Sequence, residues 1–208
     1  MTFETLLFDI APWTREIMHA AKNYPNSKFL LERSGWVDRG IKPAETIYEH
    51  TCKLTLAAYY LFGTWESVDI SISHDFPKII VRDYIPKEIT TEKKKRLEED
   101  AMQILKTGLP NGEYWYENWK KYSEKKGIGR VISQLDKICP CIQAIEYGRR
   151  YKNHNLEEFP QKAKEKIEIP ELVEILDIIC GIEISLDINP YDVYFEMLRE
   201  LHYNNQLL

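Results

Sequence analysis

Residues 128–147 have the sequence IGRVISQLDKICPCIQAIEY, and their apolar side chains follow the spacing of an amphipathic α-helix. The apolar positions recur every three or four residues and therefore share one helix face: Val131, Ile132, Leu135, Ile138, Cys139, Ile142 and Ile145. Asp136 lies beside that face, and a carboxylate directed inward needs a hydrogen-bond partner or a metal ion. This stretch therefore predicts a buried helix that carries one polar group into the interior.

The same helical spacing recurs outward from this stretch in both directions. The predicted helical segments are about 3–21, 44–62, 65–74, 91–105, 114–122, 155–167, 170–180 and 190–206. Gly63 supplies a helix end after the second of these segments. No segment alternates apolar and polar residues between hairpin turns, as a half-buried β-strand would. The sequence therefore predicts an all-α fold, a compact bundle of about eight helices.

The composition is that of an ordinary globular protein, since 44% of the 208 residues are hydrophobic and 29% are charged. This length fits one domain, or one domain with a tail. The net charge of −5, without a dominant basic block, argues against a nucleic-acid polymer as partner. The apolar runs are too short to span a bilayer, so we expect no membrane partner. Four scattered cysteines and the absence of a signal-peptide pattern predict a cytoplasmic protein.

Two of the five histidines stand beside acidic residues on predicted helices. His50 lies on the apolar face of its helix, and His74 is followed directly by Asp75. Together with Asp136, these side chains would offer two imidazoles and two carboxylates to one divalent ion, and such mixed ligands suit Mn, Fe, Co, Ni or Zn. Spacing alone leaves alternatives to metal binding open. His50 is also explained as an ordinary core histidine, and the His-Asp dipeptide as a chance occurrence.

Five stretches resemble, in order and in approximate spacing, the motifs of the HD-domain phosphohydrolases. They are GWVDRGIKPAETIYEH (35–50), SHDFPKIIVRDYIP (73–86), EKKKRLEEDAM (92–102), QLDKICPCIQAIEYG (134–148) and EKIEIPELVEIL (165–176). The similarity is to the 5′-deoxynucleotidase branch, which includes the HD-domain-containing protein 2 group. The resemblance implies an HD domain over 28–180, an N-terminal helical extension over 1–27, and a C-terminal helical extension over 181–208 packed on the same domain.

The resemblance also implies roles for individual residues. The family's four metal ligands correspond to His50, His74, Asp75 and Asp136. Asp83 matches an acidic residue near the substrate sugar and the metal-bound water, and Trp36 matches a tryptophan that borders the nucleotide pocket. Family members are described as homodimers that remove the 5′-phosphate from deoxynucleoside monophosphates. We therefore expect one divalent transition metal ion, a small-molecule nucleotide as substrate, and a homodimer.

Two positions depart from the family pattern. The family has a glutamate four residues after the HD histidine, as a general acid or to orient the attacking water, and this chain has Lys78 there. In one interpretation, Lys78 binds the substrate phosphate, and solvent or Asp83 supplies the proton to the leaving group. Alternatively it points to solvent and the site is catalytically weak. Gly35 stands where the nucleotidases have arginine, so Arg33 or Arg39 is expected to hold the phosphate instead.

Three functional hypotheses follow from the sequence. The first is a metal-dependent phosphohydrolase that acts on a nucleotide through metal-activated water, with Asp83 and Lys78 beside the reacting groups. The second is a catalytically weakened HD-domain protein that binds a metal ion or a nucleotide and regulates another process. The third is a helical protein with a purely structural role and no metal. The motifs favour the first.

Overall fold

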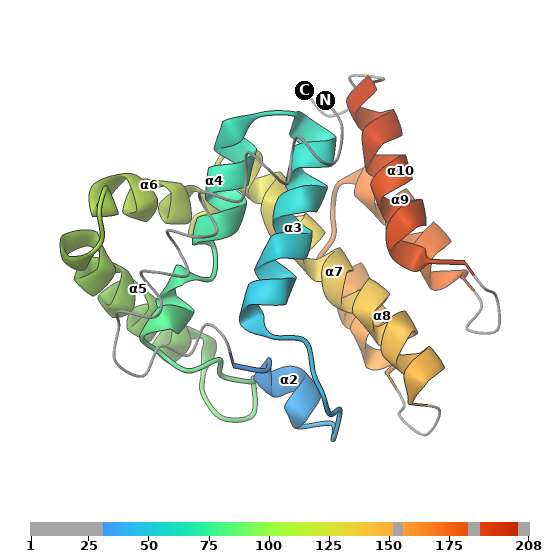
Figure 1. Cartoon of the computed structure of the whole chain (residues 1–208), viewed down its shortest axis with the longest axis horizontal. Coiled ribbons are helices and arrows are strands. Elements are labelled where there is room, and N and C mark those ends of the chain that lie inside the picture. The colour runs from blue at the N-terminus through green and yellow to red at the C-terminus, as the bar shows by residue number, and fades with distance from the viewer. Residues whose placement is uncertain (1–30, 152–155, 183–187, 204–208) are drawn as a thin grey trace.

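The computed structural model describes residues 31–151, 156–182 and 188–203, and within these ranges the fold is all-α (Figure 1). This confirms the predicted fold class. The described residues contain nine α-helices, among them the four-residue α2, and one short 3-10 helix, η1. The elements are α2 (Ser34–Val37), α3 (Ile47–Phe62), α4 (Trp65–Ser73), η1 (Phe76–Ile79), α5 (Thr91–Gly108), α6 (Gly112–Ser123), α7 (Ile128–Arg150), α8 (Glu158–Lys164), α9 (Pro170–Cys180) and α10 (Pro190–Tyr203).

Helix α3 begins at Ile47, slightly after the predicted start, because Thr46 caps it. The Thr46 hydroxyl accepts a hydrogen bond from the Glu49 amide, and the Glu49 carboxylate accepts one from the Thr46 amide. This reciprocal pair is a capping box, which satisfies amides that the first helical turn leaves without partners. Gly63 ends the helix with φ at 64°, a left-handed conformation that glycine adopts without a steric penalty.

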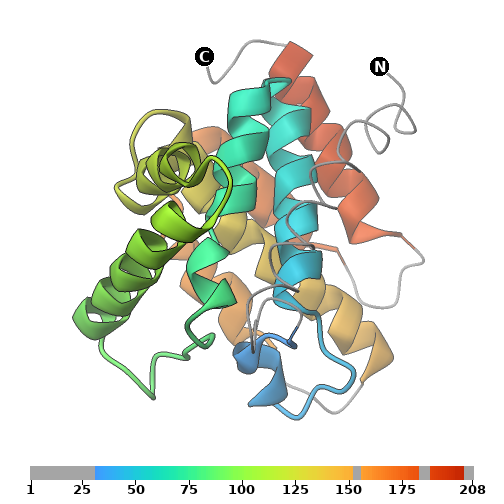
Figure 2. The ribbon, with the colours of Figure 1, turned by 60° about the vertical axis from the view of Figure 1, so that its left-hand side comes forward.

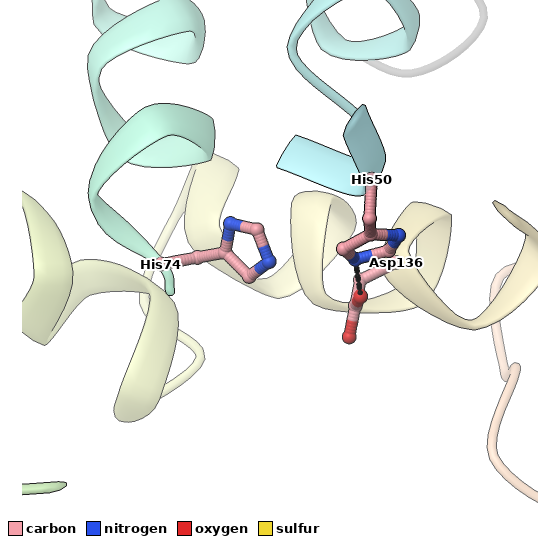
Figure 3. Close-up of side chains that lie close together, drawn as sticks. All are labelled: His50, His74 and Asp136. Atoms are coloured by element: carbon pink, nitrogen blue, oxygen red, sulfur yellow. Dashed lines mark hydrogen bonds and ion pairs between the residues drawn. The ribbon is translucent and has the colours of Figure 1, made fainter. Parts of the chain in front are cut away.

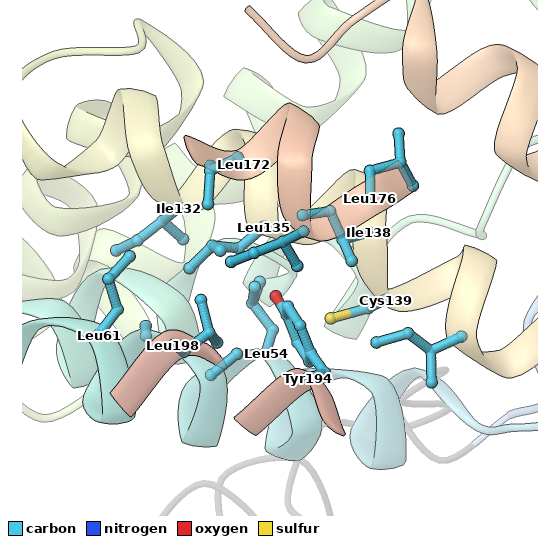
Figure 4. Close-up of a cluster of buried hydrophobic side chains, with 14 of the residues drawn as sticks. Leu54, Leu61, Ile132, Leu135, Ile138, Cys139, Leu172, Leu176, Tyr194 and Leu198 are labelled. Atoms are coloured by element: carbon cyan, nitrogen blue, oxygen red, sulfur yellow. The ribbon is translucent and has the colours of Figure 1, made fainter. Parts of the chain in front are cut away.

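Helices α3 and α7 lie at the centre of the molecule; α10 packs against both of them, and α9 packs against α7 and α10 (Figures 1 and 4). Their apolar side chains form the largest buried cluster, which includes Leu54, Leu61, Ile132, Leu135, Ile138, Leu172, Leu176, Tyr194 and Leu198. Burying one large apolar side chain contributes roughly 1.5–3 kcal/mol. The face predicted for residues 128–147 is therefore the face on which the other helices assemble.

A second buried cluster lies among α4, η1, α5 and α6, of which α6 packs against α4 and α5 against α6 and η1. Figure 2 shows the course of these elements. It combines residues of α3, α4, η1, α5 and α6: Ile47, Val68, Phe76, Ile79, Met102, Leu105, Trp115 and Trp119. The apolar residues of η1 belong to this cluster, and α5 packs directly against η1. The short helix that follows His74 is therefore held in place by packing on its neighbours.

The two predicted extensions differ in whether the structure describes them. The N-terminal helical extension over 1–27 lies outside the described residues. Near the other end, α10 packs against α3, α7 and α9, and its residues Tyr194 and Leu198 are 0% exposed. The domain limits at residues 28 and 180 stay predictions.

Candidate metal centre

His50 projects from the first turns of α3, whose start the capping box fixes. Its side chain is 1% exposed, and its Nε2 lies 2.8 Å from Oδ1 of Asp136. Its other ring nitrogen, Nδ1, is buried and has no hydrogen-bond partner. Burial, and then the positive charge of Arg33, lower the pKa of His50. The ring is therefore neutral at pH 7, which leaves one nitrogen with a lone pair, as metal binding requires.

His74 follows the last residue of α4 as its C-cap. Its Nδ1 lies 2.5 Å from the carbonyl oxygen of Ser71. Because a carbonyl only accepts, Nδ1 carries the hydrogen, and in a neutral ring the lone pair is then on Nε2. That Nε2 is buried without a hydrogen-bond partner, although Oδ2 of Asp75 is 3.3 Å away. A backbone carbonyl on one nitrogen and an unused lone pair on the other is the arrangement of a metal-binding histidine.

Asp136 lies on α7 and directs both carboxylate oxygens to neighbouring side chains. Oδ1 faces His50, and Oδ2 accepts hydrogen bonds from the Tyr122 hydroxyl at 2.7 Å and from the Lys137 ammonium. Burial raises the pKa of Asp136, but the charge of Lys137 and the bond to His50 outweigh it and hold this pKa well below its usual range. The sequence argument that this carboxylate points inward and needs partners agrees with these contacts.

Figure 3 shows His74 and the hydrogen-bonded pair of His50 and Asp136 approaching one another from three helical elements. One ligand atom of each residue lies within 4.8 Å of the other two. Ligands on opposite sides of a single ion stand about 4 Å apart, because each metal–ligand bond is about 2.0–2.2 Å long. Small side-chain adjustments therefore suffice to bind one ion. The buried Nε2 of His74, a ring nitrogen of His50 and a carboxylate oxygen of Asp136 are a donor set that fits a divalent transition metal.

Asp75, the fourth predicted ligand, lies beside this group but is engaged by Lys78. The Lys78 ammonium is 2.9 Å from Oδ2 of Asp75 and 3.1 Å from Oδ1 of Asp83. Lys78 is only 7% exposed, so the alternative in which it points to solvent is wrong. Burial lowers the pKa of Lys78, but the two carboxylates outweigh it and raise the pKa above its usual range, so the ammonium is charged at pH 7.

Asp83 connects the cluster to the segment that precedes α3. Its Oδ1 faces Lys78, and its Oδ2 accepts a hydrogen bond from the backbone amide of Ser34 at 2.9 Å. Because α2 begins at Ser34, this bond fixes the first turn of α2 next to η1 and the candidate metal ligands. The structure therefore places Asp83 beside Lys78 and the start of α2, and its role near a substrate sugar and a metal-bound water stays a prediction.

The three candidate substrate-binding residues have different surroundings. Arg33 pairs with the buried carboxylate of Glu45 at 3.1 Å, and its charge acts on His50, Asp75 and Asp136. Arg39 instead pairs with Glu158, donates to the carbonyl of Gly35 and lies over the ring of Phe159. Trp36 is 2% exposed and stacks on that same Phe159 ring at 4.2 Å. Arg33 alone of the three acts electrostatically on the candidate metal ligands.

Two residues near the centre do not emerge from the sequence argument. Tyr122 belongs to the helix predicted over 114–122, and its hydroxyl donates to Asp136 while its ring contacts that of His74, with the ring centroids 5.2 Å apart. Glu45 is 5% exposed and pairs with Arg33 and with Lys53. No local pattern marks either residue, because both act through contacts with distant parts of the chain.

Comparison with known proteins assigns the chain to a family. The HD domain family matches residues 28–173. The chain belongs to the HD domain family. It is 28% identical over 155 residues to human 5′-deoxynucleotidase HDDC2, a match that covers 70% of this chain and 76% of the human protein. It is 30% identical over 133 residues to Saccharomyces cerevisiae 5′-deoxynucleotidase YGK1, covering 57% of this chain and 61% of the yeast protein.

A solved structure supports the fold of this HD domain. A conserved hypothetical protein from Pyrococcus furiosus superimposes with a TM-score of 0.60 at 22% sequence identity. The match covers 74% of this chain and 95% of the archaeal one. At this identity the likeness concerns the fold, and it agrees with the all-α architecture of the described residues.

Proposed function

We propose that this HD-domain protein is a metal-dependent phosphohydrolase that removes phosphate from a nucleotide, with 5′-deoxynucleoside monophosphates as the substrate class. The observation that carries the proposal is the convergence of His50, His74 and Asp136, one ligand atom of each lying within 4.8 Å of the other two, with His74 Nε2 buried and without a hydrogen-bond partner. The relatives HDDC2 and YGK1 are both named 5′-deoxynucleotidases, which supports the substrate class.

The metal would be held by His50, His74 and Asp136, with Asp75 as a fourth ligand. Neutral imidazoles and carboxylates suit one ion of Mn, Co, Fe, Ni or Zn. When bound, such an ion lowers the pKa of a water ligand and polarises a phosphoryl oxygen. The hydrogen bond from His74 Nδ1 to Ser71 fixes the ring, so that Nε2 points to the centre.

Arg33 is the residue we propose to neutralise the phosphate charge. A guanidinium presents paired donors that match phosphate oxygens, and Arg33 already acts on the carboxylates of the centre. Arg39 is less suited, because Glu158 and the carbonyl of Gly35 occupy its donors. Trp36 lies in α2, two residues after Ser34, and we propose that it borders the nucleotide pocket.

Asp83 and Lys78 are the side chains that we place beside the reacting groups. Lys78 carries a positive charge and no acceptor, so it attracts phosphate oxygens but does not take a proton from water. Asp83 is an acceptor: burial raises its pKa, yet Lys78 and Arg33 outweigh this and lower it, so the group is ionised at pH 7. Asp83 would therefore orient the water or the sugar, and the leaving-group proton would come from solvent.

The test is phosphate release from dAMP by the purified protein supplied with Mn²⁺ or Co²⁺. We expect turnover by the wild type and a loss of at least about 10²-fold in His74→Ala, because the variant removes a ligand. His202→Ala is the matched control. His202 lies on α10, where its ring nitrogen Nδ1 bonds to the carbonyl oxygen of Leu61, and it belongs to no candidate metal-ligand group among the described residues. Absence of turnover on every deoxynucleoside monophosphate with all five metals would contradict the proposal.

A second candidate function is a regulatory protein that keeps the metal or nucleotide site but has weakened catalysis. The buried ammonium of Lys78 favours it, because a carboxylate at that position would act as acid or base and the ammonium does not. Lys78→Glu separates the two functions. A large gain in phosphate release indicates a weakened enzyme, whereas a loss makes the lysine part of a working mechanism.

The remaining partner predictions are part of this proposal. We propose a homodimer that acts on small-molecule nucleotides in the cytoplasm, without a nucleic-acid polymer as partner. Among the described residues, no helix combines the length and the apolar character needed to cross a membrane. Sedimentation of the purified protein measures the oligomeric state directly, and a monomer at all concentrations would contradict that prediction.

A further inference from the structure

We propose that Lys78 is an internal counter-cation of the metal centre, which occupies Asp75 when no metal is bound and competes with the ion for that carboxylate. The inference rests on the metal centre proposed above and goes beyond it. The competition predicts that this chain binds its metal more weakly than the same ligands would without the lysine. It also predicts that the site stays folded when no metal is bound.

The key observation is that one oxygen atom has two neighbours. Oδ2 of Asp75 is the oxygen 3.3 Å from His74 Nε2, the nitrogen with the unused lone pair. The same Oδ2 accepts the hydrogen bond from the Lys78 ammonium at 2.9 Å. An ion bound to His74 and to Oδ2 of Asp75 would therefore share that oxygen with a fixed positive charge.

The lysine has little freedom to leave. The backbone amide of Lys78 donates to the carbonyl of Asp75 at 2.9 Å, within the single turn of η1. The neighbouring residues Phe76 and Ile79 are 2% exposed and belong to the buried cluster shared with α5 and α6. The ammonium is also held by Asp83, whose second oxygen is bonded to the Ser34 amide. The position of the charge is thus set by the packing of η1 and by the carboxylates of Asp75 and Asp83.

The positive charge of Lys78 balances the negative charges of Asp75 and Asp83. Asp75 and Asp83 are both largely buried, and buried carboxylates without a counter-charge destabilise the folded state. Lys78 supplies that charge permanently, so the protein does not require the ion for this purpose. The same charge repels an arriving dication at short range, where little water screens the interaction.

The experiment compares wild type, Lys78→Met and Lys78→Arg in two measurements. Metal affinity is measured by calorimetric titration of Mn²⁺ or Co²⁺ into chelator-treated protein, and stability by thermal unfolding with and without the ion. We expect Lys78→Met to bind the ion at least about tenfold more tightly and to unfold at a lower temperature without it. We expect Lys78→Arg, which keeps the charge, to retain the weaker affinity of the wild type.

Lys53→Met is the matched control. Lys53 also pairs with a buried carboxylate, Glu45, at 2.8 Å, but it does not contact Asp75. Its replacement should lower the unfolding temperature without tightening metal binding. If Lys78→Met does not fold, Lys78→Gln removes the charge while keeping a hydrogen-bond donor for Asp75.

The outcomes separate this inference from the proposed function. Equal metal affinity in wild type and in the folded neutral variant would overturn the counter-cation role and leave the metal centre standing. Weaker binding in the neutral variant would overturn it as well. If neither protein binds any of the metals, the metal centre itself fails and the inference with it. Tighter binding in the neutral variant, with arginine resembling the wild type, supports it.

Discussion

Asp136 shows how a single carboxylate is oriented before any ligand arrives. Its partners come from three helices: His50 from α3, Tyr122 from α6 and Lys137 from α7. Burial, and then the negative charge of Asp136, raise the pKa of Tyr122 well above its usual range, so the phenol stays protonated and donates. A ligand held in this way loses little orientational freedom when it binds an ion.

The first residue-scale prediction concerns Tyr122→Phe. The variant removes one donor from Asp136 while keeping the ring, so we expect metal affinity to fall by about tenfold, near the low end of the usual 10–100-fold effect of such partners. The low end is expected because Lys137 still donates to the same oxygen. Titration of Mn²⁺ or Co²⁺ into chelator-treated protein measures the change.

Tyr116→Phe is the control for that substitution. The Tyr116 hydroxyl also binds a carboxylate, Oε1 of Glu99, at 2.6 Å, but it makes no contact with the metal ligands. Metal affinity should stay at the wild-type value in this variant. An equal loss in both variants, or no loss in Tyr122→Phe, would show that Tyr122 does not position Asp136.

At the scale of elements, the site depends on a close approach between α6 and α7. Gly129 lies in the first turn of α7, and a Cβ atom there would stand 2.1 Å from the carbonyl oxygen of Lys121 and 2.8 Å from the amide nitrogen of Tyr122. The end of α6 therefore touches the backbone of α7, which only glycine permits. This contact is what carries Tyr122 to Asp136.

Gly129→Ala tests that contact. The added methyl group must push two backbones apart, and we expect the free energy of unfolding to fall by about 2 kcal/mol or more. Urea denaturation measures it. Gly181→Ala is the control, since its Cβ would meet nothing closer than 3.4 Å and should change stability by less than about 1 kcal/mol. Similar effects in both variants would mean that the approach of α6 to α7 is not tight.

At the scale of the whole molecule, a buried ionic network joins the segment before α3 to the helical core. Glu45 accepts from Arg33 and from Lys53, and Lys53 in turn binds Gln143 on α7. The Tyr191 hydroxyl of α10 donates to the same Gln143 oxygen at 3.1 Å. Burial raises the pKa of Glu45, but the charges of Arg33 and Lys53 outweigh it and lower this pKa to about 2.

This pKa predicts how stability depends on pH. Because the folded-state pKa of about 2 lies below the ordinary 4.5, ionised Glu45 stabilises the fold fully above pH 4.5 and loses this effect as the pH falls toward 2. The full contribution is about 3 kcal/mol. Urea unfolding should show a wild-type advantage over Glu45→Gln that shrinks by about 2 kcal/mol between pH 7 and pH 3. An advantage that is the same at both pH values would contradict the assignment.

The sequence by itself determined the helical class and the positions of most helices. Burial in a helix repeats every 3.6 residues whichever partner covers it, so the apolar pattern around Leu135 is readable without knowing that α9 and α10 are the partners. The inward direction of Asp136 is readable for the same reason, since the residue sits beside that pattern. The resemblance to the HD-domain motifs added the prediction that His50, His74 and Asp136 act together as metal ligands.

Only the tertiary structure decided what surrounds these ligands. Lys78 reads equally as a solvated lysine or a buried one, because its direction depends on the packing of η1 against α5. Tyr122 and Glu45 reach the site from segments whose own sequences show ordinary aromatic and acidic residues. Contacts between distant segments obey no local period, since they depend on how closely two backbones approach, as α6 and α7 do at Gly129.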